Sequence, residues 1–159
     1  GHDLALQKSV FLAQLSIADE MDRPVSVHCL QAWGSLQECL IQSSFSGSFL
    51  LHSYGGPSEM VSSWVEMGAY FSISGYFFKK EKIGKLETFR TIPEDRLLLE
   101  TDAPDMGFDD DSARYFHDEP GNHPGNLEVV YEAYAGWSRK SLIDVAAMCE
   151  RNFSRFWNP

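Results

Sequence analysis

Residues 97–104 read Leu-Leu-Leu-Glu-Thr-Asp-Ala-Pro, an apolar run that ends in two carboxylates, Glu100 and Asp102. A short apolar run bounded by turn-forming residues is typical of a strand that is buried on both faces, so we expect a strand over residues 97–102. Side chains two positions apart on a strand point to the same side. The sequence therefore predicts that both carboxylates lie together at the carboxyl end of a buried strand.

Three earlier segments have the same character, and helical patterns separate them. We expect strands at residues 24–29, 48–54 and 69–75, and helices at residues 5–22, 57–67, 83–89, 127–136 and 141–153, with a further helix that carries Leu36, Cys39 and Leu40 and is broken at residues 46–47. Gly68 is the expected end of the helix at residues 57–67, and Ser141 with Asp144 is a capping pattern for the last helix. The tryptophans, Trp157 among them, are expected in the core. Strands that alternate with helices predict right-handed βαβ units and a parallel sheet. The expected fold class is therefore α/β, in which functional residues lie where strands end and loops begin.

Length, charge and cysteine content limit the class of protein. The chain has 159 residues, which predicts one domain over residues 1–159, and a formal charge of −10, which argues against a broad basic face for DNA. Its apolar runs are far shorter than the ~20 residues of a membrane-spanning helix. Cys29, Cys39 and Cys149 have no Cys-x-x-Cys spacing, so we expect no disulfide framework and an intracellular location, cytoplasmic by default.

Two histidines and an aspartate form the strongest candidate site. His28, His52 and Asp102 each lie at or near the carboxyl end of a predicted strand, so they can converge at one edge of the sheet. Two imidazoles and a carboxylate are a usual ligand set for a divalent metal ion. A hydrogen bond that caps the strand end is the alternative for each histidine. The repetition of this placement along one sheet favours the metal site.

Two further features each leave alternatives open. Glu100 can be a ligand, a carboxylate that orients a metal-binding histidine, or an ion-pair partner. The backbone N–H groups of Gly55 and Gly56 precede a predicted helix and can contact a phosphate. The same two residues can instead serve a turn that needs glycine.

Several motifs occur in a fixed order along the chain. They are Pro24-Val-Ser-Val-His28-Cys29, Leu51-His52-Ser-Tyr54, Tyr70-Phe-Ser-Ile-Ser-Gly75, Leu98-Leu-Glu-Thr-Asp-Ala-Pro104, Asn122-His-Pro-Gly-Asn-Leu127 and Asn152-Phe153. Together they resemble the TatD-type metal-dependent deoxyribonucleases of the amidohydrolase superfamily. The segment Leu-Glu-Thr-Asp-Ala-Pro is the most specific of these motifs.

This resemblance implies a TIM-type (β/α)₈ barrel that holds two divalent metal ions, such as Mg²⁺, Mn²⁺ or Zn²⁺, at its strand ends. It also implies hydrolysis of DNA phosphodiester bonds, at 3′ ends or internally. By resemblance, His28 and His52 correspond to metal ligands on the fifth and sixth strands. Asp102 corresponds to the catalytic aspartate of the eighth strand, which binds metal and helps to activate water, and Glu100 to a carboxylate that orients a ligand.

The sequence departs from the family pattern in length and in ligands. Such a barrel needs ~250 residues, and this chain resembles only strands five to eight, an incomplete barrel. The His-x-His pair of the first strand and the bridging glutamate of the fourth have no counterpart. We therefore expect impaired catalysis. The open sheet edges and the exposed apolar inner face of a half-barrel predict self-association, pairing with an N-terminal half, or poor stability. The alternatives are a non-catalytic member that binds a metal or a partner, and an amidohydrolase that cleaves esters or amides.

Overall fold

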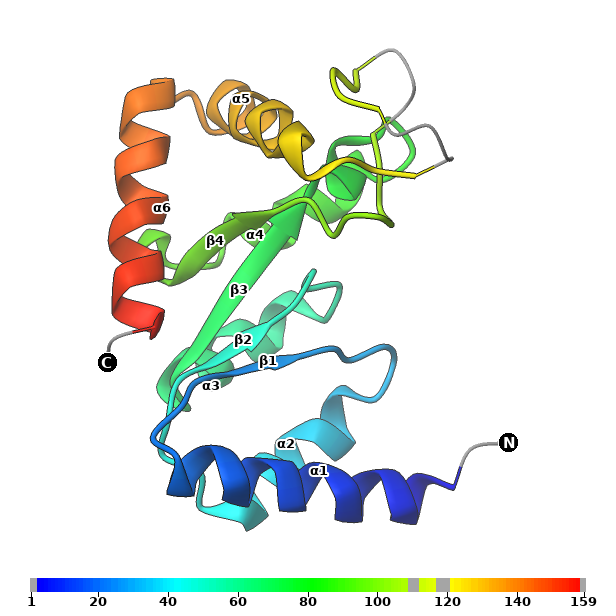
Figure 1. Cartoon of the computed structure of the whole chain (residues 1–159), viewed down its shortest axis with the longest axis vertical. Helices are drawn as coiled ribbons and strands as arrows, with labels where there is room; N and C mark the ends of the chain where they lie inside the picture. Colours follow the sequence, from blue (N-terminus) through cyan, green and yellow to red (C-terminus); the bar gives the residue numbers. More distant parts are fainter. Residues whose placement is uncertain (1–2, 109–111, 117–120, 158–159) are drawn as a thin grey trace.

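The computed structural model describes residues 3–108, 112–116 and 121–157, and a four-stranded parallel sheet lies at its centre (Figure 1). The strands are β1 (Val25–Val27), β2 (Phe49–Leu51), β3 (Ala69–Ser74) and β4 (Leu97–Glu100). They are ordered β1-β2-β3-β4, so each strand pairs with the next one along the chain. The parallel α/β sheet is thus confirmed, with strands somewhat shorter than the sequence predicts.

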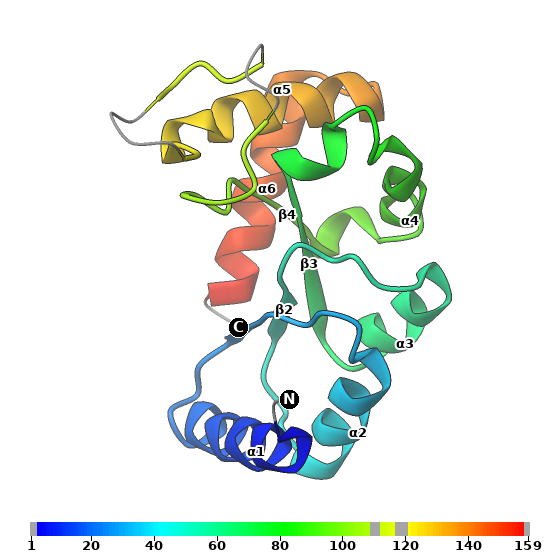
Figure 2. The ribbon, with the colours of Figure 1, turned by 90° about the vertical axis from the view of Figure 1, so that its right-hand side faces the viewer.

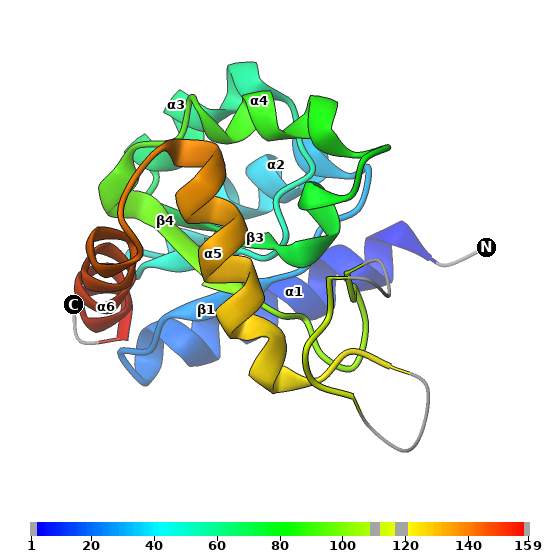
Figure 3. The same ribbon diagram turned by 90° about the horizontal axis from the view of Figure 1, so that it is seen from above.

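One helix precedes the first strand, and the other helices connect the strands or follow the last of them. They are α1 (Leu4–Glu20), α2 (Trp33–Ser43), α3 (Val61–Glu66), α4 (Leu86–Phe89), α5 (Leu127–Ser138) and α6 (Leu142–Trp157). Figure 2 shows α2, α3 and α4 on one side of the sheet and α6 on the other. Figures 1 and 3 show that α5 lies over the edge of the sheet that β4 forms, and it contacts β4 (Figure 3).

Local chemistry sets where these helices begin and end. The carboxylate of Asp3 accepts hydrogen bonds from two backbone N–H groups in the first turn of α1. The hydroxyl of Ser141 accepts one from the N–H of Asp144 at 3.1 Å, which confirms the predicted cap of α6. Gly68, with φ of 94°, ends α3 as expected. The second helix ends earlier than the predicted break at residues 46–47, because Ser44 adopts the left-handed conformation.

The two faces of the sheet have different surroundings. Side chains such as Leu51, Phe71 and Ile73 pack against the helices in the main hydrophobic core, which also contains the fully buried Trp64. The opposite face, which we call the inner face, carries Leu50, Tyr70 and Leu98, and Phe156 of α6 packs against this smaller cluster. The inner face is therefore only partly covered, by the last turns of α6.

A groove of about 500 Å³ remains between the inner face and α6. Leu50 and Leu98 line it from the sheet, and Phe153 and Trp157 line it from α6. The sequence favours a core position for Trp157, which is wrong, because 47% of its surface is exposed. No helix among residues 3–108, 112–116 and 121–157 is long and apolar enough to cross a membrane.

Candidate metal centre

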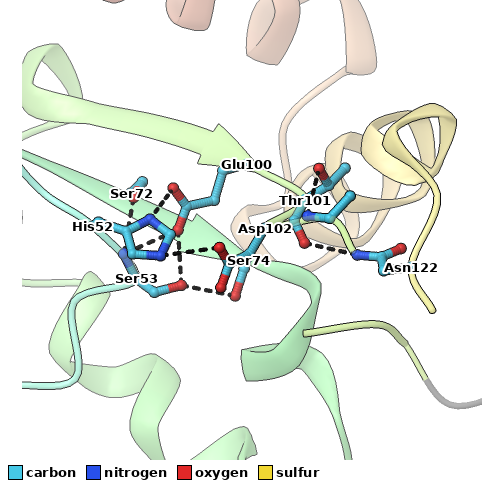
Figure 4. A network of polar contacts seen from close by, with 9 residues as sticks. His52, Ser53, Ser72, Ser74, Glu100, Thr101, Asp102 and Asn122 are labelled. Carbon is cyan, nitrogen blue, oxygen red and sulfur yellow. Dashed lines mark hydrogen bonds and ion pairs between the residues drawn. The ribbon is translucent and has the colours of Figure 1, made fainter. Parts of the chain in front are cut away.

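The strand ends bring four predicted site residues to one edge of the inner face. His28 directly follows β1, His52 directly follows β2, Glu100 ends β4, and Asp102 lies two residues further on. Parallel register aligns these ends, because Val27 pairs with Leu51. Of the predicted convergence of His28, His52 and Asp102, the structure shows His52 in contact with Asp102, and Glu100 contacts the other side of the same ring (Figure 4).

The imidazole of His52 lies between two carboxylates. Its Nδ1 is 2.8 Å from Oε2 of Glu100, and its Nε2 is 3.1 Å from Oδ1 of Asp102. The side chains of His52, Glu100 and Asp102 are 19%, 17% and 27% exposed, so water screens these charges only in part. The hydrogen bond with Glu100 is the main reason why the pKa of His52 is raised above its ordinary value.

Glu100 is held in its ionised form by several donors. Burial favours the neutral acid, but hydrogen bonds with His52, Ser72 and Ser53 outweigh it, so the pKa of Glu100 lies below its ordinary value. The hydroxyl and the backbone N–H of Ser53 both donate to Oε1, at 2.7 and 2.9 Å. The other oxygen, Oε2, is left to accept from Nδ1–H of His52. These contacts fit two of the alternatives left open for Glu100, the carboxylate that orients a histidine and the ion-pair partner.

This orientation leaves Nε2 of His52 facing an oxygen that can only accept. If Nδ1 carries the single proton of a neutral ring, Nε2 presents its lone pair to Oδ1 of Asp102 at 3.1 Å. A proton or a metal ion between the two atoms makes this arrangement favourable. An imidazole nitrogen and a carboxylate oxygen are donors that divalent metals accept. The chemistry of this pair therefore fits a metal ion.

His28 lies beside this pair but farther away. Its ring centroid is 5.7 Å from that of His52, and its side chain is exposed. Within the described part of the chain, no group of three or more histidines, cysteines or acids is close enough together to hold a metal ion. His52 and Asp102 thus form a pair of donors, with His28 as a neighbour that the structure does not bring into the same cluster.

The turn at Gly55 and Gly56 has a role in packing, whether or not it also contacts a phosphate. A Cβ atom on Gly56 would lie 2.7 Å from ring atoms of Tyr54, whereas one on Gly55 would have its nearest neighbour, Ser53 O, at 3.9 Å. Tyr54 is buried, and its hydroxyl donates to the carbonyl of Pro57 at 2.7 Å. Glycine is thus required at residue 56 for a structural reason, and the phosphate contact stays a prediction.

The polar residues that support the site lie within the motifs of the sequence, but no role was predicted for them from the sequence. Ser53 holds Glu100, Ser72 and Ser74 are buried in β3, and Asn122 donates to the carbonyl of Thr101 (Figure 4). The serines of β3 alternate with Phe71 and Ile73, and polar residues at every second position of a buried strand are a signal that was available. Ser53 lies in the motif Leu51-His52-Ser-Tyr54, but the motif did not predict its role, which depends on a contact with a residue 47 positions along the chain.

The chain matches known proteins over nearly all its length. A family model described as TatD related DNase matches residues 2–158. A 3′-5′ ssDNA/RNA exonuclease TatD of Shigella flexneri is 30% identical over 152 residues, covering 92% of this chain and 56% of that protein. An uncharacterized metal-dependent hydrolase, YabD, of Bacillus subtilis is 27% identical, covering 96% of this chain and 58% of that protein. The chain thus spans somewhat more than half the length of these relatives.

Solved structures show the same fold. A TatD-family hydrolase of Entamoeba histolytica superimposes with a TM-score of 0.82 at 18% identity, covering 99% of this chain and 58% of that one. The TatD homologue YjjV of Escherichia coli gives a TM-score of 0.78 at 23% identity, covering 92% of this chain and 54% of that one. These similarities confirm the predicted relation to TIM-type barrels.

Proposed function

Because this chain belongs to the TatD-related DNase family, we propose that it carries part of a divalent-metal site for the hydrolysis of phosphodiester bonds in DNA. The observation that carries the proposal is the placement of His52 between Glu100 and Asp102 at the carboxyl ends of the strands. The name of one relative, a metal-dependent hydrolase, supports the use of a metal. The name of another, an ssDNA/RNA exonuclease, supports nucleic-acid ends as the substrate.

In this proposal each residue of the site has a separate role. A bound divalent metal lowers the pKa of water and offsets the negative charge that develops on a phosphate. Nε2 of His52 and the carboxylate of Asp102 would hold it, with His28 as a further ligand. Glu100 keeps the ring of His52 turned so that Nε2 faces Asp102. Asp102 is the catalytic base that accepts a proton from the attacking water.

An anionic substrate must approach an acidic chain, whose formal charge is −10. The positive charge at the strand ends would therefore come from the metal, since a bound divalent ion can reverse the local field. The N–H groups of Gly55 and Gly56 are our candidate phosphate contacts. The metals we consider are Mg²⁺, Mn²⁺ and Zn²⁺. A pair of donors is only part of a binuclear site, so we propose that the activity of this chain alone is impaired.

We further propose that residues 1–159 form one domain, equivalent to strands five to eight of the barrel. β1 and β4 are the edges of the sheet, and the groove on the inner face is lined by apolar side chains. Self-association or pairing with an N-terminal half would cover these surfaces. Cys29, Cys39 and Cys149 are free thiols, in keeping with the intracellular location that we propose.

The proposed function is tested by incubating the purified chain with end-labelled single-stranded DNA and Mg²⁺ or Mn²⁺. The variants are Asp102→Asn and His28→Ala, and Asp95→Asn, an exposed acid outside the site, is the matched control. Cleavage that needs metal, persists in Asp95→Asn and is lost in the other two supports the proposal. Labelling the strand at one end or the other separates 3′-terminal from internal cleavage. An RNA strand of the same sequence tests whether the chain prefers DNA or RNA.

Two other outcomes point to the alternative functions. A folded chain that binds metal but cleaves nothing would be a non-catalytic member of the family. Hydrolysis of a chromogenic ester without cleavage of DNA would identify ester or amide hydrolysis instead. Sedimentation analysis of the same sample decides whether the chain associates with itself.

A further inference from the structure

Asn122 and Asn126 are buried amides next to the strand end that carries Asp102. They are 5% and 1% exposed, and buried amides persist only when their hydrogen bonds are satisfied. The Nδ2 of Asn122 donates to the carbonyl oxygen of Thr101 at 2.7 Å (Figure 4). Its Oδ1 accepts from Nδ2 of Asn126 at 3.1 Å. The pair thus connects the start of α5 to the residue immediately before Asp102.

Asn126 is itself fixed at three points. Its Oδ1 accepts from the backbone N–H groups of Arg114 and Tyr115, both at 2.9 Å. Its Nδ2 donates to the carbonyl oxygen of Tyr115 at 2.9 Å. Because both ends of this side chain are occupied, Asn126 holds the side chain of Asn122 in one orientation.

The backbone around Asp102 needs such support. β4 ends at Glu100, so Thr101 lies beyond the paired part of the strand. Asp102 has φ of 58°, in the left-handed region that is unfavourable for residues other than glycine. The carbonyl of Thr101 belongs to the peptide group between Thr101 and Asp102, whose orientation relative to Asp102 is set by φ of Asp102. The hydrogen bond from Asn122 holds this peptide group in place. Asn122 also donates from its backbone N–H to Pro104 O at 2.6 Å, on the other side of Asp102.

We propose that Asn122, held by Asn126, is a positioning residue for Asp102. It keeps the backbone at Asp102 in the left-handed conformation that places Oδ1 at 3.1 Å from Nε2 of His52. Asn122 acts through the peptide of Thr101 and touches neither metal nor substrate. The effect on metal binding rests on the proposed function, in which His52 and Asp102 share a metal ion.

The test compares Mn²⁺ binding, measured by electron paramagnetic resonance, in the full chain and three variants. Asn122→Ala is expected to lose about tenfold or more in affinity, since partners that orient metal ligands have effects of that size. Asn152→Ala is the matched control, because Asn152 is 2% exposed and also donates to two backbone carbonyls, at 2.6 and 2.7 Å, but lies outside the site. It should lose stability and keep its affinity. Asp102→Asn shows the Mn²⁺ affinity that remains when the metal site is lost completely.

A second readout needs no metal. The N–H of Asp105 donates to the carbonyl of Asp102 at 2.8 Å. The rate of hydrogen exchange at the Asp105 amide therefore reports whether the backbone at Asp102 keeps this conformation. Asn122→Ala should speed this exchange about tenfold or more, and Asn152→Ala should not under conditions where both chains stay folded. If Asn122→Ala does not fold, Asn122→Asp, which has the same size and lacks the donor to Thr101, takes its place.

The outcomes separate the two proposals. Wild-type Mn²⁺ affinity in Asn122→Ala, together with loss in Asp102→Asn, overturns the positioning role. Unchanged affinity in Asp102→Asn overturns the metal site, and the exchange of the Asp105 amide then decides the positioning role alone. Exchange at wild-type rate in the Asn122 variant would show that the backbone at Asp102 keeps its conformation without this hydrogen bond.

Discussion

The Nδ1 atom of His52 lies 2.8 Å from Oε2 of Glu100. Because Glu100 is ionised and can only accept, this contact places the ring proton on Nδ1 and leaves Nε2 to face Asp102. We predict that Glu100→Gln weakens Mn²⁺ or Zn²⁺ binding about tenfold, since an amide holds the Nδ1–H tautomer less strongly. Calorimetric titration measures the affinity, and ¹⁵N chemical shifts of the imidazole measure the tautomer.

Glu87→Gln is the control for this substitution. Glu87 is an exposed residue of α4, whose carboxylate lies 3.2 Å from Nε of Arg90. Its replacement removes the same charge from the chain but should leave both the tautomer and the affinity unchanged. Equal effects of the two variants would show that net charge, and not the contact with His52, controls binding.

A second prediction concerns the attachment of α6 to β4. The Nδ2 of Asn152 donates to the carbonyls of Glu94 and Leu97 at 2.6 and 2.7 Å, and Leu97 is the first residue of β4. Asn152→Ala leaves both carbonyls without this partner, so the free energy of unfolding should fall by about 2 kcal/mol. Urea denaturation measures the change. Ser154→Ala, at an exposed position of the same helix, should be nearly neutral, and a similar loss in both variants would contradict the explanation.

A third prediction separates the two glycines that precede α3. Gly56→Ala places a methyl group against the buried ring of Tyr54, at 2.7 Å, and should destabilise the fold by about 1–3 kcal/mol. Gly55→Ala meets nothing closer than 3.9 Å and should leave stability almost unchanged. Thermal unfolding checks both. If Gly55→Ala nevertheless weakens binding of a DNA strand, the phosphate contact proposed for this turn gains support.

Periodicity and strand order were enough to predict the strands, the main helices and the position of His52, Glu100 and Asp102 at one edge of the sheet. The spacing of Glu100 and Asp102 predicted their common side, and the position of His52 after an apolar run predicted its place at the same edge. The hydrogen bonds that support these residues were harder to predict from the sequence. The contact between Ser53 and Glu100, and that between Asn122 and Thr101, join segments whose separation is set only when the chain is folded.

The cover on the inner face was equally hard to predict. Phe156 packs on Tyr70 with ring centroids 5.3 Å apart. The end of α6 therefore covers apolar residues of the inner face that we expected to be exposed in a half-barrel. A helical apolar pattern shows that a face will be buried but not which surface it will meet. The same uncertainty explains the wrong expectation for Trp157, which lies next to Phe156 and remains 47% exposed.

The last prediction concerns metal as a stabilising ligand. In the metal-free chain, Nε2 of His52 faces Asp102 with a proton as the available positive charge between them. A divalent ion that takes this place binds the folded state only, so at a hundredfold excess over its dissociation constant it should add about 2.7 kcal/mol to the free energy of unfolding. Thermal unfolding with rising Mn²⁺ should therefore show an increasing midpoint that EDTA reverses. Asp102→Asn should abolish the increase, and Asp95→Asn should keep it. An equal increase in all three chains would mean that Mn²⁺ acts elsewhere on this acidic surface.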